Sequence, residues 1–351
     1  MIRLEVRSST PAWLNLALPV MAVVITLTLC SSLIALAGAS VLSSYAIMAA
    51  AAFGDLYSVT ETLVRAAPMI FTGLAVAVAF RAKFWNIGAE GQLLAGAVAS
   101  CAIGSVAMPG PLGMAAMAIA GAIAGGAAAL VPALLRVRLK VDDVVSSLLL
   151  NSVIFFALMA LVEGPWKDSL SGYPISPPIQ DSAMFPVLIA GTRLHLGVLA
   201  ALLMAPIIWF VISRTVLGFS IRVTGENPEA ARYSGISIDR VLVLTALLSG
   251  GLAGLAGVSQ VGGVHYQVMA EISPGYGYSG IVIAMLARLN PLGVVPAAIF
   301  LAAVMTGADA MSRATGVPAF LSEVIQGTAL LAMLAALLFM NYRLRFQGRP
   351  A

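Results

Sequence analysis

Residues 194–240 read LHLGVLAALLMAPIIWFVISRTVLGFSIRVTGENPEAARYSGISIDR. The first part, 194–213, is almost wholly apolar, and about 20 such residues are enough to cross a bilayer as one helix. The last part, 222–240, is the most hydrophilic run in the chain, and another apolar segment, 241–262, follows it. This order predicts a helical membrane protein in which two crossings flank a charged loop.

The composition supports the same class for the whole chain. Of its 351 residues, 60% are hydrophobic and only 10% are charged, and the mean hydropathy is +1.00. So few charges cannot cover a soluble protein of this length. The 33 glycines suit helices that pack closely in lipid, and the short alternating segments typical of a membrane β-barrel do not occur. We therefore expect an all-α polytopic integral membrane protein, with residues 1–351 forming a single transmembrane domain.

Apolar segments predict about ten membrane helices. Two are weak candidates: residues 84–106 carry Glu90 and Gln92, and residues 278–288 are too short to span at about 1.5 Å per residue. Such segments suit broken or re-entrant helices, which occur where the backbone is buried in protein or lines a cavity. The predicted segments are 12–37, 60–80, 84–106, 112–135, 143–162, 194–213, 241–262, 278–288, 291–311 and 318–340.

The positive charges predict the orientation. With a cytoplasmic N-terminus, ten crossings place most of the 19 Lys and Arg residues inside and make both termini cytoplasmic. The residues left outside are Arg65, Lys167, Arg193 and Arg313. Those inside are Arg3, Arg7, Arg81, Lys83, Arg136, Arg138, Lys140, Arg214, Arg222, Arg232, Arg240, Arg288, Arg343, Arg345 and Arg349.

Two loops stand out in this topology. Residues 163–193 form the largest outer segment, and their prolines predict an extracellular or periplasmic loop without a regular helix. Residues 214–240 form a cytoplasmic loop that contains a helix start: Asn227 is a suitable N-cap, Pro228 suits the first helical position, and Gly235 suits a left-handed end. This short helix is either a connecting turn or a docking helix for a cytoplasmic partner.

Five stretches, in this order along the chain, resemble the permease subunits of ATP-binding cassette (ABC) importers for branched-chain amino acids, simple sugars and nucleosides. They are FWNIGAEGQLLAGA (84–97), VDDVVSSLLLN (141–151), GPWKDSLSGYPIS (164–176), GENPEAARYSGI (225–236) and GYGYSGIVIAMLARLNPLG (275–293). The second and third depart slightly from the usual pattern: Asp142-Asp143 stands where Asn-Glu is common, and Pro174-Ile175-Ser176 where Pro-Gln-Ser is common.

The resemblance implies a bacterial inner-membrane (plasma-membrane) importer for a nucleoside of the purine type, or alternatively for a simple sugar such as ribose. The chain has no G-x-x-x-x-G-K-[ST] loop, so ATP and Mg²⁺ would be used by separate ATPase subunits, with no cofactor bound by this chain. Other implied partners are a second permease, expected to be a paralogue in a heterodimer, and an extracellular solute-binding protein that meets residues 163–193. The implied coupling residues are Gly225, Asn227, Pro228, Ala230, Ala231, Arg232 and Gly235.

Polar residues inside apolar segments are costly and usually face a cavity or a partner group. The candidates for the translocation pathway are Asn86, Glu90, Gln92, Asn151 and Gln260. Interhelical hydrogen bonds are the alternative interpretation for Asn151 and Gln260.

A proton-coupled secondary transporter remains open as another mechanism, because Glu90, Asp142, Asp143 and Glu323 could serve a proton relay. No inverted repeat supports it. Catalytic and metal-binding motifs are missing: His195 and His265 are well separated, and Cys30 and Cys101 have no zinc spacing. Neither an enzyme nor a nucleic-acid-binding protein is therefore expected.

Overall fold

The computed structural model describes residues 2–6, 12–168, 172–317 and 342–346, together with residues 320, 323–325, 327, 328, 331, 332 and 335. The described chain is mainly helical and divides into two compact units. The first contains Met1–Val59 and Ala303–Ala351, and the second contains Thr60–Ala302. All residues of the predicted functional sites belong to the second unit.

Six helical stretches are long and apolar enough to cross a membrane by length and composition. They are Leu56–Arg81, Gly110–Leu139, Asp143–Glu163, Leu196–Arg214, Ile238–His265 and Pro291–Thr315. Shorter apolar helices are Val24–Leu36, Val41–Phe53 and Tyr276–Leu286. The protein is therefore a helical, multi-pass chain, as predicted. Most residues of the predicted segment 318–340 lie outside the described residues.

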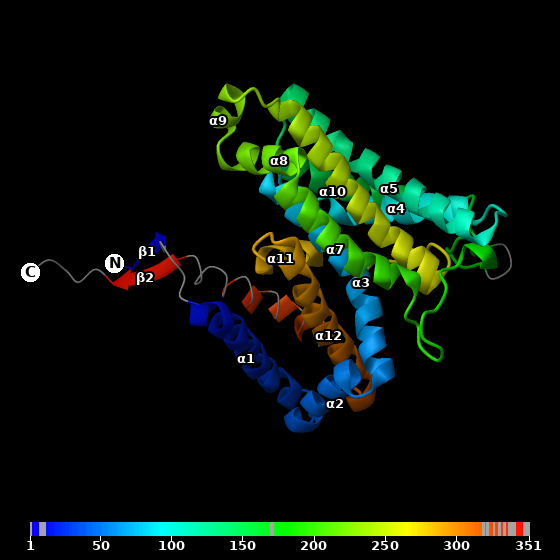
Figure 1. The fold of residues 1–351 in the computed structure, drawn as a ribbon. Helices are drawn as coiled ribbons and strands as arrows, with labels where there is room; N and C mark the ends of the chain where they lie inside the picture. The colour runs from blue at the N-terminus through cyan, green and yellow to red at the C-terminus, as the bar shows by residue number, and fades with distance from the viewer. Residues whose placement is uncertain are drawn as a thin grey trace, which may run out of the picture. The chain divides into compact units, whose positions relative to one another are not determined.

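Three helices form the centre of the second unit: α4 (Ala89–Gly104), α5 (Gly110–Leu134) and α10 (Ile238–Gln260) lie side by side (Figure 1). Glycines allow this contact. A Cβ atom on Gly96 would overlap the carbonyl oxygen of Gly254, and one on Gly125 would overlap that of Gly250. Without a strong hydrophobic driving force in lipid, such close backbone approach stabilises helix pairs by van der Waals packing.

Longer helices complete this unit. They are α3 (Leu56–Arg81), whose described side chains from Ala66 to Phe80 are all buried, α6 (Asp143–Glu163), α7 (Leu196–Arg214) and the start of α12 (Pro291–Thr315). A π-helix, η1 (Leu135–Leu139), extends α5, and another, η3 (Val261–His265), extends α10.

The two weak candidates from the sequence are short helices. Non-helical residues 82–88 precede α4, and residues 266–275 precede α11 (Tyr276–Leu286). Thr72, which lies well inside α3, donates from its hydroxyl to the carbonyl oxygen of Tyr276 at 2.9 Å. The start of α11 therefore lies beside α3, at a level between the two ends of that long helix.

The two ends of the second unit differ. At one end, α7 leads into α8 (Val216–Glu226) and α9 (Pro228–Tyr233) (Figure 1). At the other end, the loop 164–195 crosses the ends of α4 and α10; within its described residues the only helix is a 3-10 turn, η2 (Asp181–Ala183). Backbone hydrogen bonds from Gln180 to Gly104 and from Phe185 to Gly262 hold the loop there. The described residues of the loop therefore contain no regular α-helix.

The first unit contains α1 (Ala12–Leu36), α2 (Val41–Phe53) and the strands β1 (Ile2–Val6) and β2 (Tyr342–Phe346). The strands are antiparallel, with Arg3 opposite Arg345 and Glu5 opposite Arg343. This pair is a small exception to the all-α expectation. Cys30, Ile34, Ala308, Met311 and Ile325 form the buried core of the unit.

Candidate functional site

The charged loop folds into a short helix at the positions expected from the sequence. The Asn227 side-chain oxygen accepts hydrogen bonds from the backbone amides of Glu229 at 3.0 Å and Ala230 at 3.1 Å, and Pro228 is the first helical residue. Gly235 follows α9 with a φ of +77°, a left-handed conformation that glycine adopts without steric cost. Both the start and the end of α9 are therefore specified locally.

The coupling residues predicted from the resemblance divide into two groups in the structure. Asn227, Pro228, Ala230, Arg232 and Gly235 are exposed. Gly225 and Ala231 are buried, Ala231 completely. The two buried residues hold α8 and α9 against their own chain, whereas the exposed ones form the surface that a partner can reach.

The contact of Gly225 is with the end of a long helix. A Cβ atom there would overlap the carbonyl oxygen of Arg81, the last residue of α3. The Arg81 side chain in turn donates through Nε to the carbonyl oxygen of Leu289, at 2.9 Å. The α8–α9 segment is thus packed on the junction between α3 and the 287–290 turn that precedes α12.

A charged cavity of about 450 Å³ lies beside α9. Basic and acidic side chains share its wall: Lys83, Arg136, Lys140 and Arg232 with Asp142, Asp143 and Asp239. Arg136 forms an ion pair with Asp143, and Asp143 also accepts a hydrogen bond from the backbone amide of Trp85 at 2.6 Å. These contacts fix the start of the non-helical segment that leads to α4.

The polar side chains of that segment bond to one another. Asn86 donates from Nδ2 to the Gln92 Oε1 at 2.9 Å and to the Ser249 hydroxyl at 3.0 Å. Gln92 Nε2 donates back to Asn86 Oδ1 at 2.8 Å. Asn86 is fully buried and Gln92 almost so, which is tolerable because both amides are paired.

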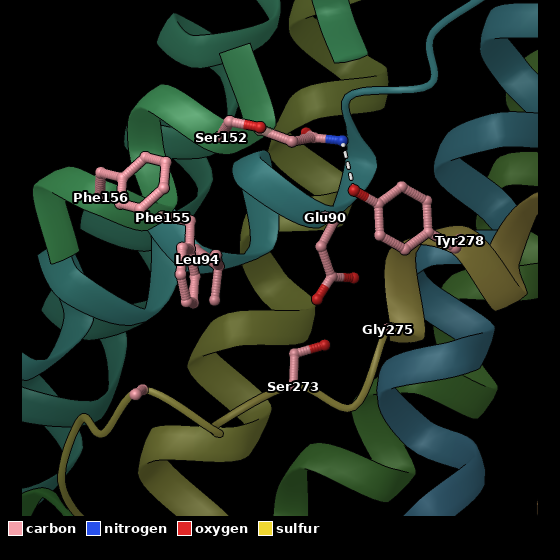
Figure 2. Close-up of a pocket in the computed structure, with 10 residues that line it drawn as sticks. Glu90, Leu94, Ser152, Phe155, Phe156, Ser273, Gly275 and Tyr278 are labelled. Atoms are coloured by element: carbon pink, nitrogen blue, oxygen red, sulfur yellow. Dashed lines mark hydrogen bonds between the residues drawn. The ribbon is translucent and has the colours of Figure 1, made fainter. Parts of the chain in front are cut away.

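A second cavity, of about 330 Å³, lies where α4 and α11 begin and α6 passes (Figure 2). The Glu90 carboxylate accepts a hydrogen bond from the backbone amide of Gly277 at 2.6 Å, which ties the first turns of α4 and α11 together. The carboxylate points towards Ser273 in the segment before α11. The remaining lining residues are Leu94, Asn151, Ser152, Phe155, Phe156, Ala270, Gly275 and Tyr278.

Asn151 joins the same three elements. Its Oδ1 accepts from the backbone amide of Gly91 at 2.9 Å, and its Nδ2 donates to the carbonyl oxygen of Ile87 at 3.1 Å and to the Tyr278 hydroxyl at 3.2 Å. The interhelical hydrogen bonds considered for Asn151 in the sequence are therefore present. The same residue also lines the cavity, so the two interpretations do not exclude each other.

The structure thus brings together two of the five predicted pathway residues, Glu90 and Asn151, at one cavity. Asn86 and Gln92 lie one turn away in their own network. Gln260 is buried at the last position of α10 and is not among the lining residues. Among the described residues, no three His, Cys, Asp or Glu side chains are placed to hold a metal ion.

The aromatic wall of this cavity is what sequence reasoning missed. Phe155 follows Asn151 by four positions on α6, and Phe156 follows Ser152 by four, so their spacing contained a usable signal. Tyr278 belongs to the GYGYSG stretch, where it was noted only as part of a motif.

Comparisons with known proteins identify the family of the chain. Residues 58–334 match the family described as the permease component of branched-chain amino acid transport systems. A glucose ABC transporter permease protein of Haloferax volcanii is 33% identical over 354 residues, covering 97% of this chain and 93% of the relative. Two guanosine ABC transporter permease proteins of Bacillus subtilis also match. One is 33% identical (95% of each chain), and the other 28% identical (69% of this chain, 78% of the relative). No solved structure matches the chain.

Proposed function

Because the chain belongs to the family of permease components of branched-chain amino acid transport systems, we propose that it is the membrane-spanning subunit of an ABC importer that moves a purine-type nucleoside across the plasma membrane. The observation that carries the mechanism is the exposed, capped helix α9, seated on the ends of membrane helices. It gives a separate cytoplasmic ATPase a rigid element to move.

Energy enters through this helix in the proposed mechanism. The ATPase binds ATP and Mg²⁺, and this chain binds no cofactor. Closure of the ATPase pair shifts Arg232 and its exposed neighbours on α9, and the buried Gly225 transmits the shift to Arg81 at the end of α3. Because packed backbone atoms cannot be compressed, the displacement passes to the helix ends as a rigid-body movement.

The orientation belongs to the same proposal. Pairing of β1 with β2 holds the two ends of the chain together, which supports an even number of crossings with both termini on one side. The α8–α9 end of the second unit also carries Arg136, Arg222 and Arg232, as expected for a cytoplasmic face. The loop 163–193 then faces outward, where a solute-binding protein delivers the solute.

The solute path passes Glu90 and Asn151, the predicted residues that line a cavity. Asn86 and Gln92 act through their hydrogen bonds, which hold the turn before α4. Gln260 belongs to the outer part of the path. A second permease subunit completes the path in this proposal. The two guanosine permease proteins of one Bacillus subtilis strain, both similar to this chain, favour a heterodimer of paralogues.

A nucleoside is favoured by the guanosine permeases among the relatives, and by a cavity that combines phenylalanine rings with hydrogen-bonding groups. A simple sugar is the second candidate, because the glucose permease protein of Haloferax volcanii is equally similar. Sugars need hydrogen-bonding groups, but they do not require two phenylalanine side chains on one wall.

Uptake measurements test the function. Cells that express the complete transporter should accumulate radiolabelled guanosine or adenosine more than ribose or glucose. Deletion of this chain should abolish this difference between nucleoside and sugar uptake. A Walker A lysine variant of the partner ATPase should stop uptake. Uptake that survives this variant but collapses with a protonophore would identify a proton-coupled transporter instead, and uptake of sugars alone would select the second candidate.

A further inference from the structure

We infer that the 330 Å³ cavity between α4, α6 and α11 is a solute subsite that stacks the base of an uncharged nucleoside on Phe155 and Phe156 and hydrogen-bonds its ribose on the opposite wall. This inference rests on the proposed function and adds a specificity to it: the permease itself, and not only a solute-binding protein, distinguishes nucleosides from plain sugars and from nucleotides.

The position suits a binding site. Both α4 and α11 begin at this cavity, after non-helical segments, and the amide of Gly277 at the start of α11 is directed at Glu90. Interrupted helices whose first turns meet between the ends of long spans are a common way for transporters to present polar groups to a solute inside the membrane. The cavity volume matches the small end of the range found for small-molecule sites.

The two walls differ in chemistry. Figure 2 shows the rings of Phe155 and Phe156 on one side, with Leu94 beside them, and Glu90, Ser273 and Tyr278 on the other. The two phenylalanine rings have centroids 5.6 Å apart and planes inclined by 67°, so they offer a face and an edge. Every purine and pyrimidine has a π-face that can stack on such a surface.

The polar wall has the complementary groups for a ribose. The Tyr278 hydroxyl accepts a hydrogen bond from Asn151, which leaves its own proton to donate. The Glu90 carboxylate accepts a hydrogen bond from the amide of Gly277, and the Ser273 side chain and the Gly275 backbone also hydrogen-bond to it. A carboxylate has about four acceptor positions, so about one remains for a sugar hydroxyl. A ribose hydroxyl, both donor and acceptor, satisfies these groups; a purely apolar solute does not.

The charge of the lining excludes anions. Among the described residues that line the cavity, Glu90 is the only ionisable group apart from the phenol of Tyr278, and none is Lys or Arg. A phosphate placed here would lose its hydration without a cation to pair with it. Nucleosides therefore fit the subsite, and nucleoside monophosphates do not.

Uptake kinetics of the complete transporter in cells test the aromatic wall. Phe155→Leu and Phe156→Leu should each raise the KM for guanosine about tenfold, because base stacking is lost, while Phe156→Trp should keep it near the wild-type value. Phe210→Leu is the matched control: Phe210 is an exposed phenylalanine on α7, outside the cavity lining, and its loss should leave KM unchanged.

Photolabelling of the purified complex tests the location directly. A radiolabelled 8-azidoguanosine should crosslink to the peptide of α6 that contains Phe155 and Phe156. Excess guanosine should compete and guanosine monophosphate should not. Labelling confined to another segment, or phenylalanine variants with the kinetics of Phe210→Leu, would overturn the subsite while guanosine uptake continued. Failure of the wild-type transporter to take up any nucleoside would overturn the proposed function as well, so the two failures are distinguishable.

Discussion

Gly225 lies so close to the carbonyl oxygen of Arg81 that no side chain fits between them. This contact joins α8, the helix before α9, to the last residue of α3. The lack of space requires glycine at this position. The backbone conformation does not, because the φ of Gly225 is not in the left-handed range. A side chain at this position must push α8 away from α3 and so shift the position of α9.

Gly225→Ala should therefore reduce uptake at least tenfold, even though alanine favours helices. The control is Gly251→Ala on α10, where the nearest atom to a new Cβ is the Ala122 carbonyl oxygen at 3.4 Å, an ordinary contact. That variant should fold and transport normally, or gain up to about 1 kcal/mol of stability from helix propensity. Equal uptake by the two variants would show that the contact with Arg81 has no role in coupling.

Arg232 presents its side chain on the exposed side of α9. Arg232→Glu should prevent co-purification of the ATPase subunits and abolish uptake, because a reversed charge in a docking surface is repelled by the groups that bound the arginine. Arg232→Lys should retain most of the association. Because the residue is exposed, thermal unfolding of the permease should be unchanged in both. Normal ATPase association with Arg232→Glu would remove α9 as the docking element.

Asn227 caps α9 with two hydrogen bonds from one side-chain oxygen. Asn227→Ala should destabilise the helix by about 1 kcal/mol, whereas Asn227→Asp should keep the cap. Hydrogen exchange of the amides in Pro228–Tyr233 measures this directly: exchange should speed up in the alanine variant only. ATP hydrolysis should also respond less to solute in that variant, since a frayed helix transmits less movement. Unchanged exchange would mean that packing alone holds α9.

The features that the sequence predicted well are local ones. The start of α9 depends on the adjacent residues Asn227 and Pro228, and its end on Gly235, so the chain specifies them within nine positions or so. The apolar crossings are equally local, because length and composition decide them. The helix α2 was not predicted, since its 13 residues are too few to span a membrane.

The features that escaped prediction depend on distant residues. Asn86 was predicted from its polarity to lie on the solute path, and its hydrogen bonds to Gln92 and to Ser249, which is 163 positions away, could not be predicted from the sequence. The aromatic wall of the cavity exists only because α6 lies beside the segment before α11. The paired strands β1 and β2 are separated in the sequence by nearly the whole length of the chain. Pattern and propensity contain no direct information on such contacts.

His195 gives the protein an acid-sensitive point at the end of the loop 164–195. It lies just before the span Leu196–Arg214, is 1% exposed, and its Nδ1 accepts a hydrogen bond from the amide of Gly197 at 3.1 Å. Burial lowers its pKa to about 4, and the nearby charge of Arg193 acts in the same direction. The folded protein therefore holds this imidazole neutral.

Stability should fall as the pH decreases from about 6.5 to about 4, because in this range the unfolded chain binds a proton that the folded chain does not. Above about pH 6.5 the contribution is constant. His195→Asn keeps an N-cap acceptor and removes the titration, so its thermal unfolding should depend less on pH in this window. Parallel pH profiles for the wild type and the variant would contradict the assignment to His195.

Asp143 is the buried partner in the ion pair at the start of α6. It accepts hydrogen bonds from the Trp85 amide and from Arg136, which also donates to the carbonyl oxygen of Lys83 at 2.8 Å. The side chain of Asp143 is only 8% exposed, and that of Arg136 is 30% exposed. Removal of the carboxylate leaves a partly buried guanidinium and a backbone amide without this acceptor.

Asp143→Ala should destabilise the protein by about 3 kcal/mol and disturb the segment that leads to Asn86 and Glu90. The neighbouring residue supplies the control: Asp142 caps α6 by accepting from the Val145 amide at 3.0 Å and is exposed. Asp142→Ala should therefore cost only about 1 kcal/mol. Chemical unfolding of both variants in detergent measures the difference. If the two cost the same, the ion pair contributes no more than a helix cap, and the connection from the α8–α9 end of the second unit to α4 must depend on backbone packing such as that between Gly225 and Arg81.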